Sequence, residues 1–127
     1  MNAVLDGVLD DLATETARLE SLVLDLPDSG WRTPTPAPGW DVATQIAHLT
    51  WTDDAAYLAA TDKQRWEALV LEMLDDPDNA VDRAALAGGV ATPAELLERW
   101  RTARGRLAET LRGYPGGQRI SLSLIHI

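Results

Sequence analysis

The sequence contains no cysteine, has few basic residues and has no long hydrophobic run. Without cysteine the chain can form no disulfide bond, thiolate metal ligand or cysteine nucleophile, so any thiol chemistry must use a thiol from outside. Eleven Lys and Arg stand against 20 Asp and Glu, which gives a formal net charge of -9. We therefore expect no nucleic-acid partner, because phosphate contacts need a clustered excess of basic side chains.

No apolar run reaches the roughly 20 residues that a membrane span needs. The N-terminal stretch MNAVLDGVLDDL also lacks the basic start of a secretory signal. We therefore expect a cytoplasmic protein that does not bind membranes. Of the 127 residues 46% are apolar and 24% are charged, values typical of a single globular domain with its own core.

Apolar residues recur at three- and four-residue steps, a pattern that is typical of amphipathic helices. It predicts helices over residues 2–26, 42–60, 66–74 and 93–112, whereas AVDRAALAGGV at 80–90 is ambiguous. On the first helix we expect the apolar stripe to face inward; its members are Leu5, Val8, Leu12, Leu19, Leu22 and Leu26. The fold class is all-α, most simply an antiparallel four-helix bundle.

Two of these helices begin with residues that favour capping. Asp41 precedes the second helix and can accept hydrogen bonds from the free amides of its first turn. Thr92, Pro93 and Glu95 form a compact start signal for the last helix, with Thr92 as N-cap and Glu95 as the partner in a capping box. Acidic clusters such as TDD at 52–54 and LDDPDN at 74–79 are better explained as solvated helix ends and turns than as calcium or magnesium sites, because they lack the ligand spacing of a calcium loop.

His48 is one of two histidines and lies at the edge of the apolar face of the second helix, on one stripe with Trp51. Taken alone, a helical histidine is more often a packing residue than a metal ligand, because ligands occur in clusters. Trp51 could form a pocket wall, although tryptophans at helical spacing are more often core anchors.

The last seven residues, SLSLIHI, do not continue the helical pattern. They alternate polar and apolar residues without charges, caps or turn residues, which predicts a short strand with nothing to pair against. We interpret residues 121–127 as a non-native tail and residues 1–120 as one helical domain. His126 therefore receives little weight as a metal ligand.

The long first helix, the loop WRTPTPAPGWDV and the segment ATQIAHLTWTD together resemble the N-terminal metal-binding domain of mycothiol-dependent maleylpyruvate isomerase-like proteins, within the DinB-like superfamily. The resemblance covers about residues 1–120 and is most specific over 31–54. It implies a DinB-like bundle in which a divalent metal, usually zinc, is held by a histidine of the second helix and by a Glu-x-x-x-His pair on a later helix. His48 matches the first ligand. No Glu-x-x-x-His follows, so we expect a truncated bundle without its last native helix and an incomplete metal site.

The resemblance also implies a reaction. An open metal position can lower the pKa of a bound external thiol and present it as a nucleophile. Mycothiol would be this low-molecular-weight thiol, and a small molecule would be the substrate of an isomerase or a thiol transferase. No residue of this chain is assigned a catalytic role, and the fragment itself is expected to be inactive.

A competing hypothesis assigns the chain to a different class, a non-catalytic helical interaction module. Its apolar stripes would bury against a partner or against a second copy, which would give a homodimer. A variant of this hypothesis states that a bundle without its last helix exposes an apolar groove and self-associates.

Overall fold

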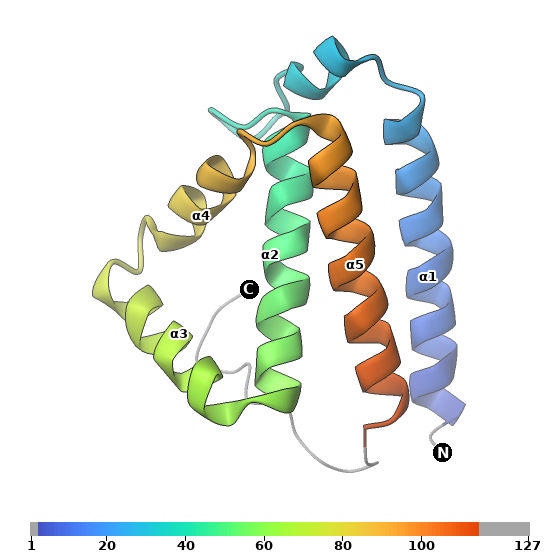
Figure 1. Cartoon of the computed structure of the whole chain (residues 1–127), viewed down its shortest axis with the longest axis vertical. Coiled ribbons are helices and arrows are strands. Elements are labelled where there is room, and N and C mark those ends of the chain that lie inside the picture. The colour runs from blue at the N-terminus through green and yellow to red at the C-terminus, as the bar shows by residue number, and fades with distance from the viewer. Residues whose placement is uncertain (1–2, 115–127) are drawn as a thin grey trace.

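The computed structural model describes residues 3–114, whose regular elements are all helical (Figure 1). The elements in chain order are α1 (Ala3–Leu24), a 3-10 helix η1 (Asp28–Arg32), α2 (Val42–Thr61), α3 (Lys63–Asp75), α4 (Ala80–Gly88) and α5 (Pro93–Arg112). Within the described part of the chain no strand is present, and the one isolated bridge joins Pro34 to Asp41. The all-α prediction is confirmed, and the ambiguous segment forms α4.

Three long helices, α1, α2 and α5, lie side by side, and the shorter α3 and α4 project to one side of α2 (Figure 1). The most extensive contact between elements joins α2 to α5, and α1 packs mainly on α5. Helices α2 and α5 run in the same direction, because α3 and α4 return the chain to the end at which α2 begins (Figure 1). The arrangement is consistent with a DinB-like helical bundle.

Tryptophans anchor two separate parts of the core. Trp31 and Trp100 belong to the main cluster between α1, η1, α2 and α5; its other buried members are Val23, Ala43, Ile46, Ala47 and Leu96. Trp66 belongs to a smaller cluster with Ala55 and Val70, where α3 packs on α2. The expectation that tryptophans serve mainly as core anchors is confirmed for these three residues.

The buried face of α1 differs from the predicted one. Leu9 and Val23 are buried, whereas Val8, Leu12 and Leu22 are 58%, 53% and 63% exposed. The prediction that these last three side chains face inward is wrong, and Leu26 is exposed as well. The physical reason is that α1 contacts its neighbours along only one edge of its apolar stripe, while no helix within residues 3–114 covers the other edge.

Local capping follows the predictions. The Asp41 carboxylate accepts hydrogen bonds from the backbone amide and the hydroxyl of Thr44, both at 2.8 Å. Thr92 caps α5 by accepting from the amide of Glu95 at 3.2 Å. The Glu95 carboxylate in turn accepts from the Thr92 hydroxyl at 3.1 Å.

The loop before α2 is tied to the connection between α4 and α5 by one guanidinium. Arg32 donates hydrogen bonds to the carbonyl oxygens of Gly89 and Ala91, the second at 2.8 Å, and lies 3.7 Å from the Asp41 carboxylate.

None of the helices between residues 3 and 114 has the length and apolar character that a membrane-spanning helix needs.

Candidate functional site

His48 lies on α2 between two indole rings. Its ring centroid is 5.3 Å from that of Trp40, at an interplanar angle of 55°, and 6.5 Å from that of Trp51, at 13°. The indole of Trp40 donates a hydrogen bond to Asp82 of α4, which fixes the loop side of this arrangement. The half-buried imidazole is therefore held between α2 and the preceding loop. The position of Trp51 beside His48 was predicted from the helical stripe that the two residues share, whereas the approach of the Trp40 ring to His48 was not predicted.

The environment of His48 favours the neutral imidazole. Burial lowers the pKa of His48, because a charged ring would lose hydration in this position. Its Nδ1 atom is buried and has no hydrogen-bond partner among the described residues. A neutral imidazole is the form that binds metal ions, but a histidine ligand usually donates its other ring N–H to a carbonyl or a carboxylate.

A metal site needs more than this one side chain. Within residues 3–114, no group of three or more His, Cys, Asp or Glu side chains is placed to hold a metal ion. His126 lies outside the described residues. The residues present therefore do not form a metal centre by themselves, and His48 as a metal ligand stays a prediction.

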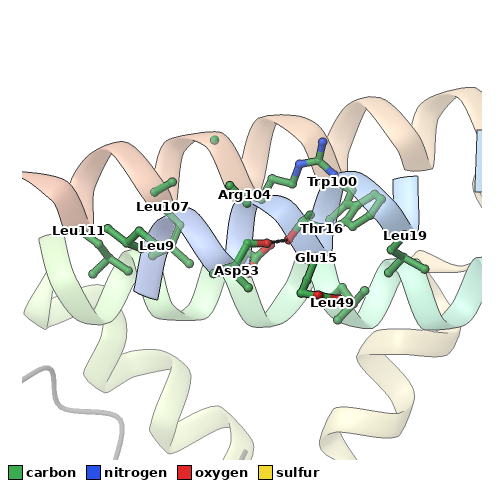
Figure 2. A pocket seen from close by; sticks show the side chains of 14 residues that line it. Leu9, Glu15, Thr16, Leu19, Leu49, Asp53, Trp100, Arg104, Leu107 and Leu111 are labelled. Carbon is green, nitrogen blue, oxygen red and sulfur yellow. Dashed lines mark hydrogen bonds between the residues drawn. The ribbon is translucent and has the colours of Figure 1, made fainter. Parts of the chain in front are cut away.

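A groove of about 390 Å³ lies along a different side of α2, between α1, α2 and α5 (Figure 2). We call it the α1–α2 groove. Its walls are mainly apolar; the lining residues are Leu9, Leu12, Ala13, Glu15, Thr16, Leu19, Leu49, Asp53, Trp100, Arg104, Gly105, Leu107, Ala108 and Leu111. His48 is not among them. Trp51 lines a smaller hollow of about 180 Å³ between α2, α4 and α5, which His48 does not line either.

Asp53 is the carboxylate in the middle of the α1–α2 groove (Figure 2). Burial raises the pKa of Asp53 to about 6, and the negative charge of Asp54 adds to this shift, while Arg104 opposes it. Arg104 does not pair with Asp53, because its guanidinium binds Glu20 and stacks on Trp100 with 4.4 Å between the guanidinium carbon and the ring centroid. The interpretation of TDD as simply solvated is wrong for Asp53. The sequence could not show the burial of Asp53, because the groove around this residue is closed only by the placement of α1.

Asp53→Asn is expected to stabilise the fold by about 1 kcal/mol near neutral pH. The pKa of Asp53 in the folded chain lies above its ordinary value, so the folded chain holds the proton of Asp53 more tightly than the unfolded chain does. The ionised carboxylate therefore destabilises the folded state. The full shift would correspond to about 3 kcal/mol, which solvent screening of a partly exposed group reduces. Urea denaturation across a pH series measures the effect: the gain is complete above about pH 6 and vanishes as the pH falls toward about 4.

The matched control for this variant is Asp54→Asn. Asp54 pairs with Arg106 at 3.0 Å and does not line the α1–α2 groove, so its replacement should give no stabilisation. A gain from Asp53→Asn that does not change with pH would contradict the assignment of the effect to ionisation.

The comparison with known proteins identifies the family. Residues 12–122 match the mycothiol maleylpyruvate isomerase N-terminal domain. The chain belongs to this family. The match includes the specific stretch 31–54 and confirms the resemblance. It extends to residue 122, whereas the predicted domain boundary at 120 and the non-native tail 121–127 lie outside the described residues and stay predictions.

Two curated relatives of this family member come from Mycobacterium tuberculosis. They are uncharacterized protein MT0041 of strain CDC 1551 / Oshkosh and uncharacterized protein Rv0036c of strain ATCC 25618 / H37Rv. Each is 44% identical over 111 residues, which cover 87% of this chain and 43% of the relative. The chain thus spans less than half the length of these relatives. No solved structure matches the chain significantly.

Proposed function

We propose that the chain is part of a mycothiol-dependent isomerase or thiol transferase, in which mycothiol is the nucleophile and a divalent metal ion, expected to be zinc, activates it. His48 would supply one ligand. The observation that carries the proposal is the half-buried imidazole on α2, kept neutral by its lowered pKa, at the position that the family resemblance assigns to the first ligand. A cytoplasmic location and a small-molecule substrate belong to the same proposal.

The contribution of this chain would be to position the imidazole. Trp40 and Trp51 restrict the rotation of the His48 ring, and the hydrogen bond from Trp40 to Asp82 restricts Trp40 in turn. Such support fixes the direction in which a ring nitrogen points. Further ligands would come from outside residues 3–114, because the described residues do not gather three potential metal ligands around His48.

The proposal predicts that the gene, read past codon 120 in genomic DNA, encodes Glu-x-x-x-His within a few tens of residues. The protein extended through that segment should bind one zinc ion, measured by competition with a chromophoric chelator. His48→Ala should weaken zinc binding by on the order of 100-fold, because two of three protein ligands remain.

The control for this measurement is Thr52→Ala, which changes a residue one helical turn after His48 on α2 and should leave zinc affinity unchanged. A continuation without Glu-x-x-x-His would exclude the proposed metal site, and zinc binding that is insensitive to His48→Ala would exclude His48 as a ligand. A non-catalytic interaction module is the second candidate, and the exposed apolar edge of α1 favours it.

A further inference from the structure

Asp53 is an unpaired carboxylate on the open side of the bundle. Among residues 3–114 it has no hydrogen bond or ion pair with a basic side chain, since the Arg104 guanidinium binds Glu20. Leucines lie on both sides of it along the α1–α2 groove (Figure 2). Glu15 adds a second carboxylate to the lining from α1. The groove is therefore an apolar surface with a negatively charged middle.

The helix that suits this groove is the next helix of the chain's own bundle. Helices α1, α2 and α5 lie side by side, the edge of α1 at Val8 and Leu12 is exposed, and a fourth helix would complete the bundle (Figure 1). The matched part is 43% of each curated relative, which leaves room for such a helix in a full-length protein. In the proposed function, the same helix carries Glu-x-x-x-His.

A helix that covers the groove needs a cation opposite Asp53. Closing the groove would bury Asp53 further, and an unpaired buried carboxylate is strongly unfavourable. Arg104 already neutralises Glu20 and stacks on the ring of Trp100. The cation would therefore come from the covering helix itself.

The directions of the helices indicate where this cation lies. Helices α2 and α5 run in the same direction, so a helix that follows α5 into the groove runs back along α2 in the opposite direction (Figure 1). On α2, Asp53 comes five residues after His48, which is about 7.5 Å further along the axis. On an antiparallel helix, the residue level with Asp53 therefore precedes the residue level with His48 by about five positions.

Asp53 and His48 also border one face of α2. Five residues turn an α-helix by about 500°, so the two side chains point about 140° apart. Leu49, which lines the groove, lies on the face between them. A helix seated on this face would have His48 at one border and Asp53 at the other. The middle of Glu-x-x-x-His would lie level with His48, so the position level with Asp53 is about three residues before the glutamate.

We propose that Asp53 forms an ion pair with a Lys or Arg of the helix that follows α5 in the full-length protein, about three residues before the glutamate of Glu-x-x-x-His. This pair fixes the register in which the helix lies on α2. Asp53 is thus a positioning residue, which sets the height at which Glu-x-x-x-His faces His48. The proposal rests on the proposed function for the identity of this helix.

The genomic sequence past codon 120 gives the first test. A Lys or Arg is expected within about one helical turn before the glutamate of Glu-x-x-x-His. If Glu-x-x-x-His is present without such a basic residue, the ion pair is excluded and the metal site stands. If Glu-x-x-x-His is absent, the metal site and the ion pair are both excluded.

The second test compares Asp53→Asn in two lengths of the metal-free protein by urea denaturation. In the 127-residue chain the substitution should stabilise the fold, because the carboxylate there is unpaired. In the protein extended through the Glu-x-x-x-His helix, it should raise the equilibrium constant of unfolding by about tenfold or more, because a buried cation loses its partner. Asp54→Asn, which does not line the groove, should have the same effect at both lengths.

The pH dependence distinguishes an ion pair from a packing role. The charged groups facing Asp53 are Glu15 from α1 and Arg104 from α5, with Asp54 next to it on α2. In the extended protein the cation should lower the pKa of Asp53 below its ordinary value. The loss caused by Asp53→Asn should then be constant above about pH 4 and decrease below it. In the 127-residue chain the effect has the opposite sign and changes between about pH 4 and 6.

A double-mutant cycle in the extended protein identifies the partner. Replacing the basic residue before the glutamate with Met should lower stability in the wild-type background and have little further effect in Asp53→Asn. Asp53→Glu, which keeps the charge, should retain most of the stability. Additive losses in the cycle would overturn the proposal, and so would a stabilised Asp53→Asn in the extended protein.

Discussion

Replacing Trp100 with alanine is expected to lower the free energy of unfolding by about 3–5 kcal/mol. Trp100 is 2% exposed and packs in the main core cluster with Ile46 and Leu96. Its removal would lose the transfer free energy of the indole and leave a cavity beside the α1–α2 groove. It would also remove the ring on which Arg104 stacks, at a site where Arg104 Nη1 is already buried without a hydrogen-bond partner among residues 3–114.

Urea denaturation followed by far-UV circular dichroism measures this loss. The control is Trp51→Ala, because Trp51 is only partly buried and packs at the edge of the smaller cluster. Its replacement should cost about 1–2 kcal/mol. If the two alanine variants were equally stable, the main core would not be centred on the contact between α2 and α5.

Gly89→Ala is expected to destabilise the fold by about 2–3 kcal/mol, through overpacking where α2 meets the connection between α4 and α5. A Cβ atom at Gly89 would lie 2.8 Å from the Thr44 hydroxyl oxygen and 3.0 Å from the Thr44 Cα. Thr44 is 5% exposed, and its hydroxyl and backbone amide both bind Asp41. The neighbour therefore cannot yield, and the connection would have to move.

The same chemical change at Gly105 gives the matched control. In the described part of the chain, no heavy atom outside the neighbouring helix backbone lies within 4 Å of a Cβ built there, and Gly105 is in the middle of α5. Gly105→Ala should therefore stabilise the fold by about 0.5–1 kcal/mol through helix propensity alone. In thermal unfolding, the melting temperature should fall for Gly89→Ala and rise for Gly105→Ala. A stabilised Gly89→Ala would contradict the close approach of the two backbones.

Features that depend on neighbouring residues were predictable from the sequence. Asp41 and Thr92 cap their helices because the acceptor and the amide are three residues apart in the chain. The inward face of α5 also agrees with its apolar spacing, and its buried residues are Leu96, Trp100, Ala103 and Leu107. The apolar face of α5 is covered by α2 and α1, so periodicity and burial coincide.

Features that depend on which helices cover which face were not predictable. The stripe on α1 has the correct period, but Leu12 is exposed because burial requires a neighbour that periodicity does not specify. Asp53 resembles any solvated helical carboxylate until α1 and α5 enclose it. At the candidate site, the pair of His48 and Trp51 follows from i, i+3 spacing, whereas Trp40 reaches His48 only through the path of the loop.

Arg32 has a consequence for how the chain can vary in length. Its guanidinium binds Gly89 and Ala91, residues 57 and 59 positions further along the chain, and so closes a large loop at one end of the molecule. The turn between α3 and α4 lies far from this closure, at the outer end of the loop (Figure 1). Because loop-closure entropy grows only logarithmically, with about 0.6 kcal/mol for each doubling of length, residues inserted at 76–79 would weaken the closure very little. Insertions and deletions among family members are thus best accommodated at this turn, where they leave α2, α5 and the position of His48 unchanged.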